Sequence, residues 1–125
     1  MPEEVNIVPI YTSNGDTGAI LIHPYIFNLS GEWIGWVDDE RTVFSVHGHY
    51  VGKLTMDPRI LRKREWGYGR ERRTSPPPPE KVRLPAQFPL APQLPEIPTF
   101  MMDVLDDYPE LMPSVDFGDL RDDLE

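Results

Sequence analysis

Three histidines and one acidic triplet are the side chains of this sequence whose types and spacing could do chemistry. His47 and His49 stand two residues apart around Gly48. On a strand such residues share a face, which would suit a metal ion with His23 as a third ligand. Gly48 is also typical of a turn, and histidines that flank a turn are exposed side chains. We therefore expect no metal and no other cofactor.

The acidic triplet is Asp38-Asp39-Glu40. Paired carboxylates can do acid–base work, but they need an apolar pocket that separates their pKa values. A polar turn between two strands explains the triplet better. No serine nucleophile motif, phosphate-binding glycine loop or HExxH helix is present. We expect no catalytic residues and no enzyme; an enzyme built on His47, His49 and residues 38–40 is the third alternative.

A basic stretch, residues 59–73, interleaves Trp66 and Tyr68 with arginines. This combination can bind nucleic acid through phosphate contacts and base stacking. Residues 59–83 carry a net charge of +6, but residues 99–125 carry −8 and the whole chain −9. Three alternatives stay open: nucleic-acid binding, a contact between the basic stretch and the acidic tail, and a solvated charged strand. The basic patch consists of Arg62, Lys63, Arg64, Arg70, Arg72 and Arg73.

The elements that must position these side chains are repeated. Four segments begin 16, 17 and 17 residues apart: IYTSNGDTGAIL, IFNLSGEWIGWV, VFSVHGHYVGKL and ILRKREWGYGRE. Each begins with a β-branched residue and a large apolar one. The first glycine column holds Gly15, Gly31 and Gly48, with Glu65 in the fourth segment; the second holds Ala19, Gly35, Gly52 and Gly69. Such self-similarity at one period predicts a repeat architecture.

Each segment is typical of a β-hairpin. The pairs Asn14-Gly15, Ser30-Gly31 and His47-Gly48 indicate two-residue turns, in which glycine takes a positive φ without a Cβ clash. The fourth pair, Arg64-Glu65, is a poor turn, so we expect a distorted or longer fourth hairpin.

The second glycine column has a different interpretation. Mid-strand glycine marks a bend, a bulge or a close backbone approach. Its recurrence predicts that the hairpins converge on a crowded pseudo-fourfold axis, with Trp33 and Trp36 packed over the uncovered backbone. Independent bulges in an ordinary meander are the alternative.

The first three segments, together with the proline-rich tail, resemble the 4-fold beta flower family of small bacterial proteins. The resemblance covers residues 6–71, and the departure is Glu65 in the fourth segment. It implies an all-β fold of four repeated hairpins in a pseudo-fourfold arrangement. It implies no established activity and no catalytic residues.

The tail is itself patterned. Of the 15 prolines, 11 follow Ser75, and residues 74–81 are typical of a stiff linker. Prolines then recur every third residue, which matches the three residues per turn of polyproline II. The residues before them form an apolar edge: Phe88, Ala91, Leu94 and Ile97. We expect a strap that docks on an aromatic surface; a spacer with accidental phasing is the alternative.

A short acidic amphipathic helix is predicted for residues 99–108, with Thr99 as N-cap. It is too short to be stable alone, so it must dock in a partner's groove or fold back on its own domain. Its apolar stripe holds Phe100, Met101, Val104, Leu105 and Tyr108.

The sequence thus predicts a four-hairpin β domain at residues 1–73, a proline-rich strap at 74–98 and an acidic tail at 99–125. We expect a non-enzymatic binding or assembly module whose tail docks on its own domain, another protomer or a protein partner. A nucleic-acid-binding accessory protein is the alternative. The acidic N-terminus and the lack of an 18-residue apolar run give no sign of a signal peptide or a membrane span, so we expect a cytoplasmic protein.

Overall fold

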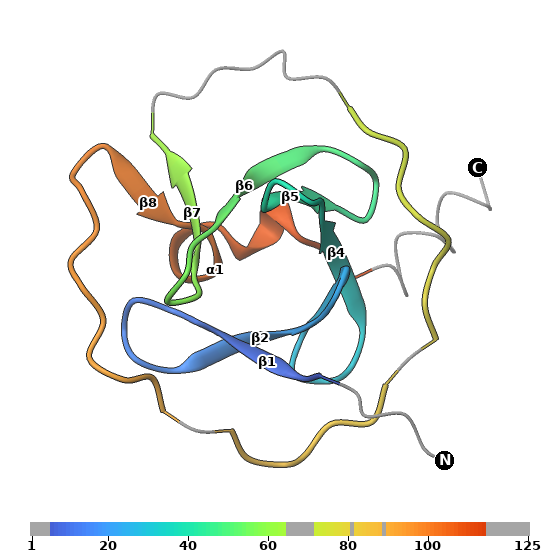
Figure 1. The fold of residues 1–125 in the computed structure, drawn as a ribbon, viewed down its shortest axis with the longest axis horizontal. Coiled ribbons are helices and arrows are strands. Elements are labelled where there is room, and N and C mark those ends of the chain that lie inside the picture. Colours follow the sequence, from blue (N-terminus) through green and yellow to red (C-terminus); the bar gives the residue numbers. More distant parts are fainter. Residues whose placement is uncertain (1–5, 65–71, 81, 89, 115–125) are drawn as a thin grey trace.

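The computed structural model describes residues 6–64, 72–80, 82–88 and 90–114. Eight antiparallel strands form one curled sheet in which each strand pairs with the next along the chain (Figure 1). A short helix, α1 (Val104–Asp107), and a 3-10 turn, η1 (Pro109–Leu111), follow the last strand. The strands are β1 (Val8–Tyr11), β2 (Thr17–Ile22), β3 (Tyr25–Phe27), β4 (Trp33–Val37), β5 (Thr42–Ser45), β6 (Tyr50–Leu54), β7 (Ile60–Lys63) and β8 (Met101–Asp103).

Three strand pairs, β1–β2, β3–β4 and β5–β6, are local hairpins, and their turns are of the same type. In the first hairpin, Thr12 N donates to Asp16 O at 2.8 Å and Gly15 N donates to Thr12 O at 3.0 Å. Equivalent bonds close the other two hairpins, and the turn glycines have φ values of +101°, +87° and +89°. These are three-residue loops that end on a left-handed glycine, not the two-residue turns that the dipeptides predict. Glycine is required there because a Cβ atom strains this conformation.

The second glycine column lies opposite the β-branched residue that begins each repeat. Ile26 pairs with Gly35 and Val43 with Gly52, and the register shifts by one residue directly afterwards. A Cβ atom on Gly35 would lie 2.5 Å from the carbonyl oxygen of Phe44. One on Gly52 would lie 2.5 Å from that of Leu61. The close approach predicted for this column therefore occurs at both glycines, and its cause is the backbone of the following strand.

Two apolar clusters occupy the two faces of the sheet, because neighbouring residues of a strand point to opposite sides. The inner cluster includes the first residue of every repeat, each fully buried: Ile10, Ile26, Val43 and Ile60. The aromatic cluster holds Phe27, Trp33, Trp36, Phe44 and Val46. Trp33 Nε1 donates to the Gly35 carbonyl at 2.6 Å, and the Trp36 ring stacks on Phe44 with centroids 4.6 Å apart. Trp33 thus contacts the Gly35 backbone, whereas Trp36 packs on the neighbouring strand β5.

The fourth strand pair is not a local hairpin in the described residues. β7 pairs with β8, about forty residues away, in the register Leu61–Asp103 to Lys63–Met101. Gly69 and residues 65–71 lie outside the described residues. The helix predicted to begin at Thr99 is wrong: residues 101–103 are a strand, and the helix begins at Val104 with Asp103 as N-cap. Residues 101–103 gain the hydrogen bonds of the β7 edge, which a helical conformation would forgo.

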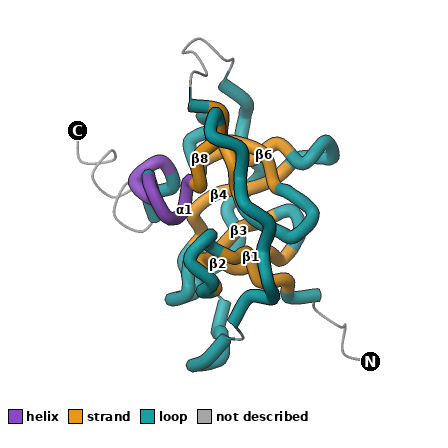
Figure 2. The backbone as a smooth tube through the Cα atoms, turned by 90° about the vertical axis from the view of Figure 1, so that its left-hand side faces the viewer, coloured by secondary structure: helices purple, strands orange, loops and turns teal. Residues whose placement is uncertain are grey.

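The strap, defined here as residues 72–80, 82–88 and 90–98, runs around the outside of the strands. Figure 1 shows it in yellow to orange, circling the sheet before the chain returns to β7. In Figure 2, turned by 90°, the strap passes in front of the strands while α1 lies on one end of the sheet. Val104 and Met112 then enter the inner cluster, so the segment that follows the strap completes the core.

Candidate functional site: the strap crossings and the clasp

The strap crosses the three hairpin turns at regular intervals. Arg73 N donates to Gly48 O at 2.9 Å, Val82 N to Gly31 O at 3.2 Å, and Ala91 N to Gly15 O at 2.9 Å. The donors are nine residues apart along the strap, and the turns are met in reverse chain order. Because proline has no N–H, only the non-proline positions of this segment can make such bonds. The three turn carbonyls therefore bind the strap through its backbone.

Nine residues beyond Ala91, the strap meets the end of β7. Arg64 N donates to the carbonyl of Phe100 at 2.8 Å, and Arg64 Nε donates to that of Thr99 at 2.8 Å. These contacts lead directly into the β7–β8 pair. The acidic segment thus reaches the start of the basic stretch because the strap wraps around the small domain.

Two of the turn glycines are needed for the strap as well as for the turn. A Cβ atom on Gly48 would lie 1.8 Å from the carbonyl oxygen of Arg73, and one on Gly31 would lie 2.0 Å from that of Val82. A Cβ atom on Gly15 would meet nothing within 4 Å. The strap therefore lies directly against the second and third turns and less closely against the first.

The strap's predicted apolar edge is its half-buried edge. Phe88, Ala91, Leu94 and Ile97 are all half-buried, whereas the described residues between them are exposed. The aromatic cluster, however, contacts an earlier part of the strap. Trp36 Nε1 donates to Ser75 Oγ at 3.1 Å, Tyr25 Oη donates to Pro77 O at 2.7 Å, and Val82 packs on the cluster. Aromatic docking thus involves residues 75–82, because the aromatic side chains lie on β3 to β5.

A polar network, which we call the clasp, joins the end of the strap to the hairpins. It consists of the buried Arg59 and Asp103, the half-buried Asp57 and the exposed Ser13. The side chain of Asp103 is almost fully buried, with 1% of the residue exposed. Its Oδ2 accepts hydrogen bonds from Ser13 N and Ser13 Oγ, both at 2.7 Å. Its Oδ1 accepts one from Asp106 N at 3.3 Å. The carboxylate thus ties the first turn to β8 and α1.

Arg59, of which 3% is exposed, is the cation of the clasp. Its Nη1 donates to Ser13 Oγ at 2.9 Å, and its Nη2 donates to the strap carbonyl of Pro95 at 2.9 Å. Nη2 also pairs with Asp57 Oδ2 at 2.7 Å. Burial alone would raise the pKa of Asp57, but hydrogen bonds from Thr55 and Arg59 and the charge of Arg59 lower it.

The clasp holds the first turn, the strap and β8 together. The Ser13 hydroxyl donates to the Asp103 carboxylate and accepts from the Arg59 guanidinium, so it joins the two charged side chains of the network. A buried ion pair whose hydrogen bonds are satisfied fixes a geometry, and removal of one partner is costly. The sequence patterns gave no signal for this network, because Ser13 and Asp103 are 90 residues apart and Arg59 is part of the basic stretch.

The acid–base candidates serve as turn residues. Asp38 Oδ1 accepts hydrogen bonds from Glu40 N and Thr42 N, both at 2.9 Å. His47 and His49 lie on either side of the third turn glycine, and their amides donate to Ser45 Oγ. Within the described ranges, no group of three or more His, Cys, Asp and Glu side chains could hold a metal ion.

The described arginines of the basic patch contact their own chain. Arg62 Nη1 donates to the carbonyls of Tyr50 and Val51 and lies over the Tyr50 ring. Arg73 lies over the Phe44 ring, and its Nη2 is 3.4 Å from Asp38 Oδ2. Trp66, Tyr68 and Arg70 lie outside the described residues, and Lys63 ends β7. Nucleic-acid binding by this stretch stays a prediction, which the salt dependence of oligonucleotide binding would test.

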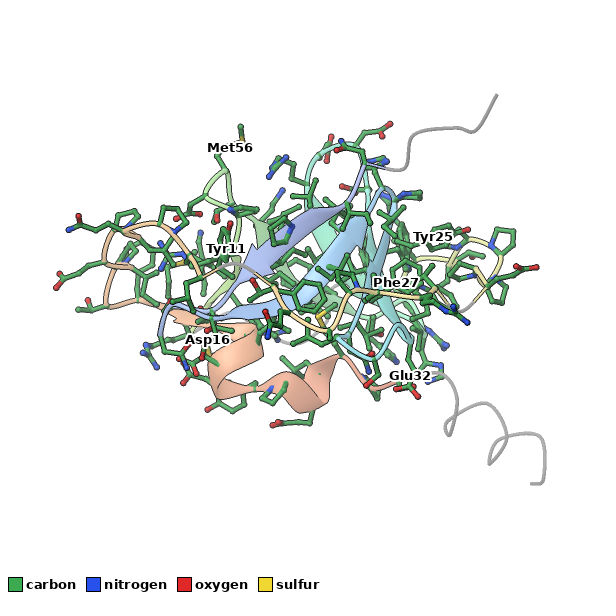
Figure 3. All side chains as sticks on the ribbon, turned by 90° about the horizontal axis from the view of Figure 1, so that it is seen from below. Tyr11, Asp16, Tyr25, Phe27, Glu32 and Met56 are labelled. Atoms are coloured by element: carbon green, nitrogen blue, oxygen red, sulfur yellow. The ribbon has the colours of Figure 1, made fainter. Side chains whose placement is uncertain are left out.

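The residues predicted to bind a partner divide into two groups. Val104 is fully buried, Leu105 packs on the inner cluster and Met101 is half-buried. Phe100 and Tyr108 stay 56% and 44% exposed. Met56, on the β6–β7 turn, projects from the surface (Figure 3).

The part of the chain that the structure describes contains no helix with the length and apolar character of a membrane span.

The fold and the crossings define an all-β class: a curled antiparallel sheet of eight strands, with the last strand delivered by a strap. The family model described as 4-fold beta flower protein matches residues 8–102, so the chain belongs to this family. The matched range includes the strap and extends into β8. Neither the curated proteins nor the solved structures gave a significant match.

Proposed function

We propose that this protein is a non-enzymatic binding or assembly module whose rim of hairpin turns binds an extended segment. The observation that carries the proposal is the set of three bonds from Arg73, Val82 and Ala91 to the turn carbonyls. Backbone carbonyls recognise the backbone N–H groups of an extended chain, and side-chain pockets then add specificity. The strap occupies the rim in this structure, so the module's first ligand is its own tail.

The proposal includes a pseudo-fourfold arrangement of the strand pairs. Its support is the spacing of the four fully buried residues that begin the repeats, which meet in one cluster: Ile10, Ile26, Val43 and Ile60. The fourth position differs in that its second strand comes from the tail. In this arrangement the rim offers similar backbone groups at successive positions, which suits a segment with a regular repeat such as the strap.

A nicked protein tests whether the strap is held by the rim and clasp or only by chain connectivity. A protease recognition sequence is inserted between Ala86 and Gln87, both of which are exposed. After cleavage we expect the two fragments to coelute from a gel-filtration column at low micromolar concentration. Immediate separation of the fragments would contradict the proposal.

The same nicked protein tests assembly. A labelled synthetic peptide covering residues 87–114 is added in excess. We expect it to replace the cleaved fragment, as a second copy's tail would. The Asp103→Ala version of the peptide is the matched control and should exchange poorly, because it cannot form the clasp. Equal incorporation of both peptides would mean that binding is not specific to this site.

A further inference from the structure

Two strap crossings have open pockets of similar volume beside them. At the second turn, a pocket of about 410 Å³ is lined by Leu29, Ser30, Val82, Arg83 and Leu84. At the third turn, a pocket of about 410 Å³ is lined by Val46, His47, Arg72, Arg73, Thr74 and Ser75. Both pockets lie where the strap passes a turn glycine. The pocket at the second turn contains one arginine, Arg83, and the pocket at the third turn contains two, Arg72 and Arg73.

Contacts with the third turn and β5 hold the two arginines at the basic pocket. Arg72 Nε donates to the carbonyl of His47 at 2.6 Å, and among the described residues Arg72 has no acidic partner. Arg73 is held over the Phe44 ring and near Asp38, yet its side chain is 53% exposed. Ser75 Oγ donates to Val46 O at 2.7 Å and accepts from Trp36 Nε1. These two hydrogen bonds fix the orientation of the Ser75 side chain at the edge of the pocket.

We propose that the pocket at the third turn binds a phosphate group. A guanidinium presents paired N–H donors that match two oxygens of a phosphate, and bonds between charged partners are the strong ones. Arg72 and Arg73 supply the charge, and His47 and Thr74 line the same space. The volume exceeds what a single phosphate needs, so a small phosphate ester also fits. This small-molecule site goes beyond the strap-binding function.

Calorimetric titration of the full-length protein with inorganic phosphate and with adenosine 5′-monophosphate tests the proposal. We expect both to bind to the wild type. We expect Arg72→Gln to weaken binding about tenfold, which corresponds to the loss of one charge-assisted hydrogen bond. Arg83→Gln, in the pocket at the second turn, is the control and should leave the affinity unchanged.

Two further comparisons separate the possible results. Arg72→Lys keeps the charge without the planar fork, so we expect an affinity between those of the wild type and Arg72→Gln. Melting temperatures of all variants establish that the strap is still docked. Tighter binding of the nucleotide identifies an ester, and equal binding identifies the phosphate group alone. No binding of either probe to the wild type, or an equal loss in Arg83→Gln, would overturn the site.

Discussion

The three local hairpins and the β7–β8 pair build the same sheet by different routes. Each hairpin closes through a left-handed glycine within a few residues, whereas β7 finds β8 about forty residues further on. The fourth repeat has Glu65 where the others have a turn glycine. The difference shows that the strap is part of the fold: where local turn chemistry is missing, the chain supplies the partner strand from its tail.

The pairing of β7 with β8 closes a larger loop, and other contacts must offset the conformational entropy that this costs. Closing a longer loop costs more conformational entropy, although this cost grows slowly with length. Burial of Val104 and Met112 supplies about 1.5 to 3 kcal/mol each. The three backbone bonds of the strap and the clasp add to this. The local hairpins need none of these contacts to close, so the fourth pair should respond most strongly to changes in the tail.

The largest effect is expected at Asp103. Asp103→Ala removes the acceptor of both Ser13 bonds and of the bond from Asp106 N that caps α1. We expect a loss of about 3 kcal/mol in the free energy of unfolding, because hydrogen bonds to a charged acceptor contribute about 1.5 to 3 kcal/mol each. Urea denaturation measures it. The control is Asp107→Ala, because Asp107 is exposed and no described hydrogen bond involves its side chain. This variant should change stability by less than about 0.5 kcal/mol.

The turn glycines give the next effect. Gly15→Ala should cost about 1 kcal/mol, because alanine is strained in the left-handed conformation but meets open space. Gly48→Ala should cost about 2 kcal/mol, since its Cβ also displaces Arg73 and breaks the Arg73–Gly48 hydrogen bond. Thermal unfolding of both variants measures the difference. Equal losses would mean that the strap does not lie against the third turn.

The smallest effects concern pH, and two carboxylates should act in opposite directions. The pKa of Asp57 is lowered in the folded protein, so its stabilising contribution is present above its ordinary value of 3.8 and is lost as the pH falls further. The pKa of Asp106 is raised by burial and by the charges of Asp103, Asp107 and Asp16, the last of which lies beside α1 (Figure 3). Ionised Asp106 therefore destabilises the fold at neutral pH.

Urea denaturation between pH 3 and pH 7 separates the two carboxylates. Asp57→Asn should be less stable than the wild type at pH 7, with a deficit that shrinks below pH 3.8. Asp106→Asn should be slightly more stable at pH 7, and this gain should vanish below pH 3.8. The same sign of effect for both variants would contradict the opposite environments of the two groups.

Features that depend on short segments could be predicted from the sequence. The glycine columns predicted the three hairpins and the close approach at Gly35 and Gly52. The proline phase predicted which strap residues, Phe88 to Ile97, turn inward. Both patterns encode local geometry: a positive φ, a mid-strand contact and a threefold helical period.

Features that depend on distant segments could not be predicted. The apolar stripe of residues 99–108 fits a helix, but the unpaired edge of β7 favours a strand at Met101–Asp103. The clasp brings Ser13, Arg59 and Asp103 together from three separate segments. One local feature, the length of the hairpin loops, was also missed, because a glycine with positive φ occurs in both two-residue and three-residue loops.

A disulfide trap tests whether the tail supplies the eighth strand. The chain has no cysteine, so Lys63→Cys with Met101→Cys gives a single pair at facing positions of β7 and β8. Directly opposed residues of antiparallel strands are within the Cα separation that a disulfide needs. Lys63→Cys with Tyr108→Cys, at an exposed position beyond α1, is the control. We expect near-complete intramolecular oxidation of the first pair under mild conditions and little of the second. A failure of the 63–101 pair to oxidise, or equal oxidation of both pairs, would contradict the strand that the tail contributes.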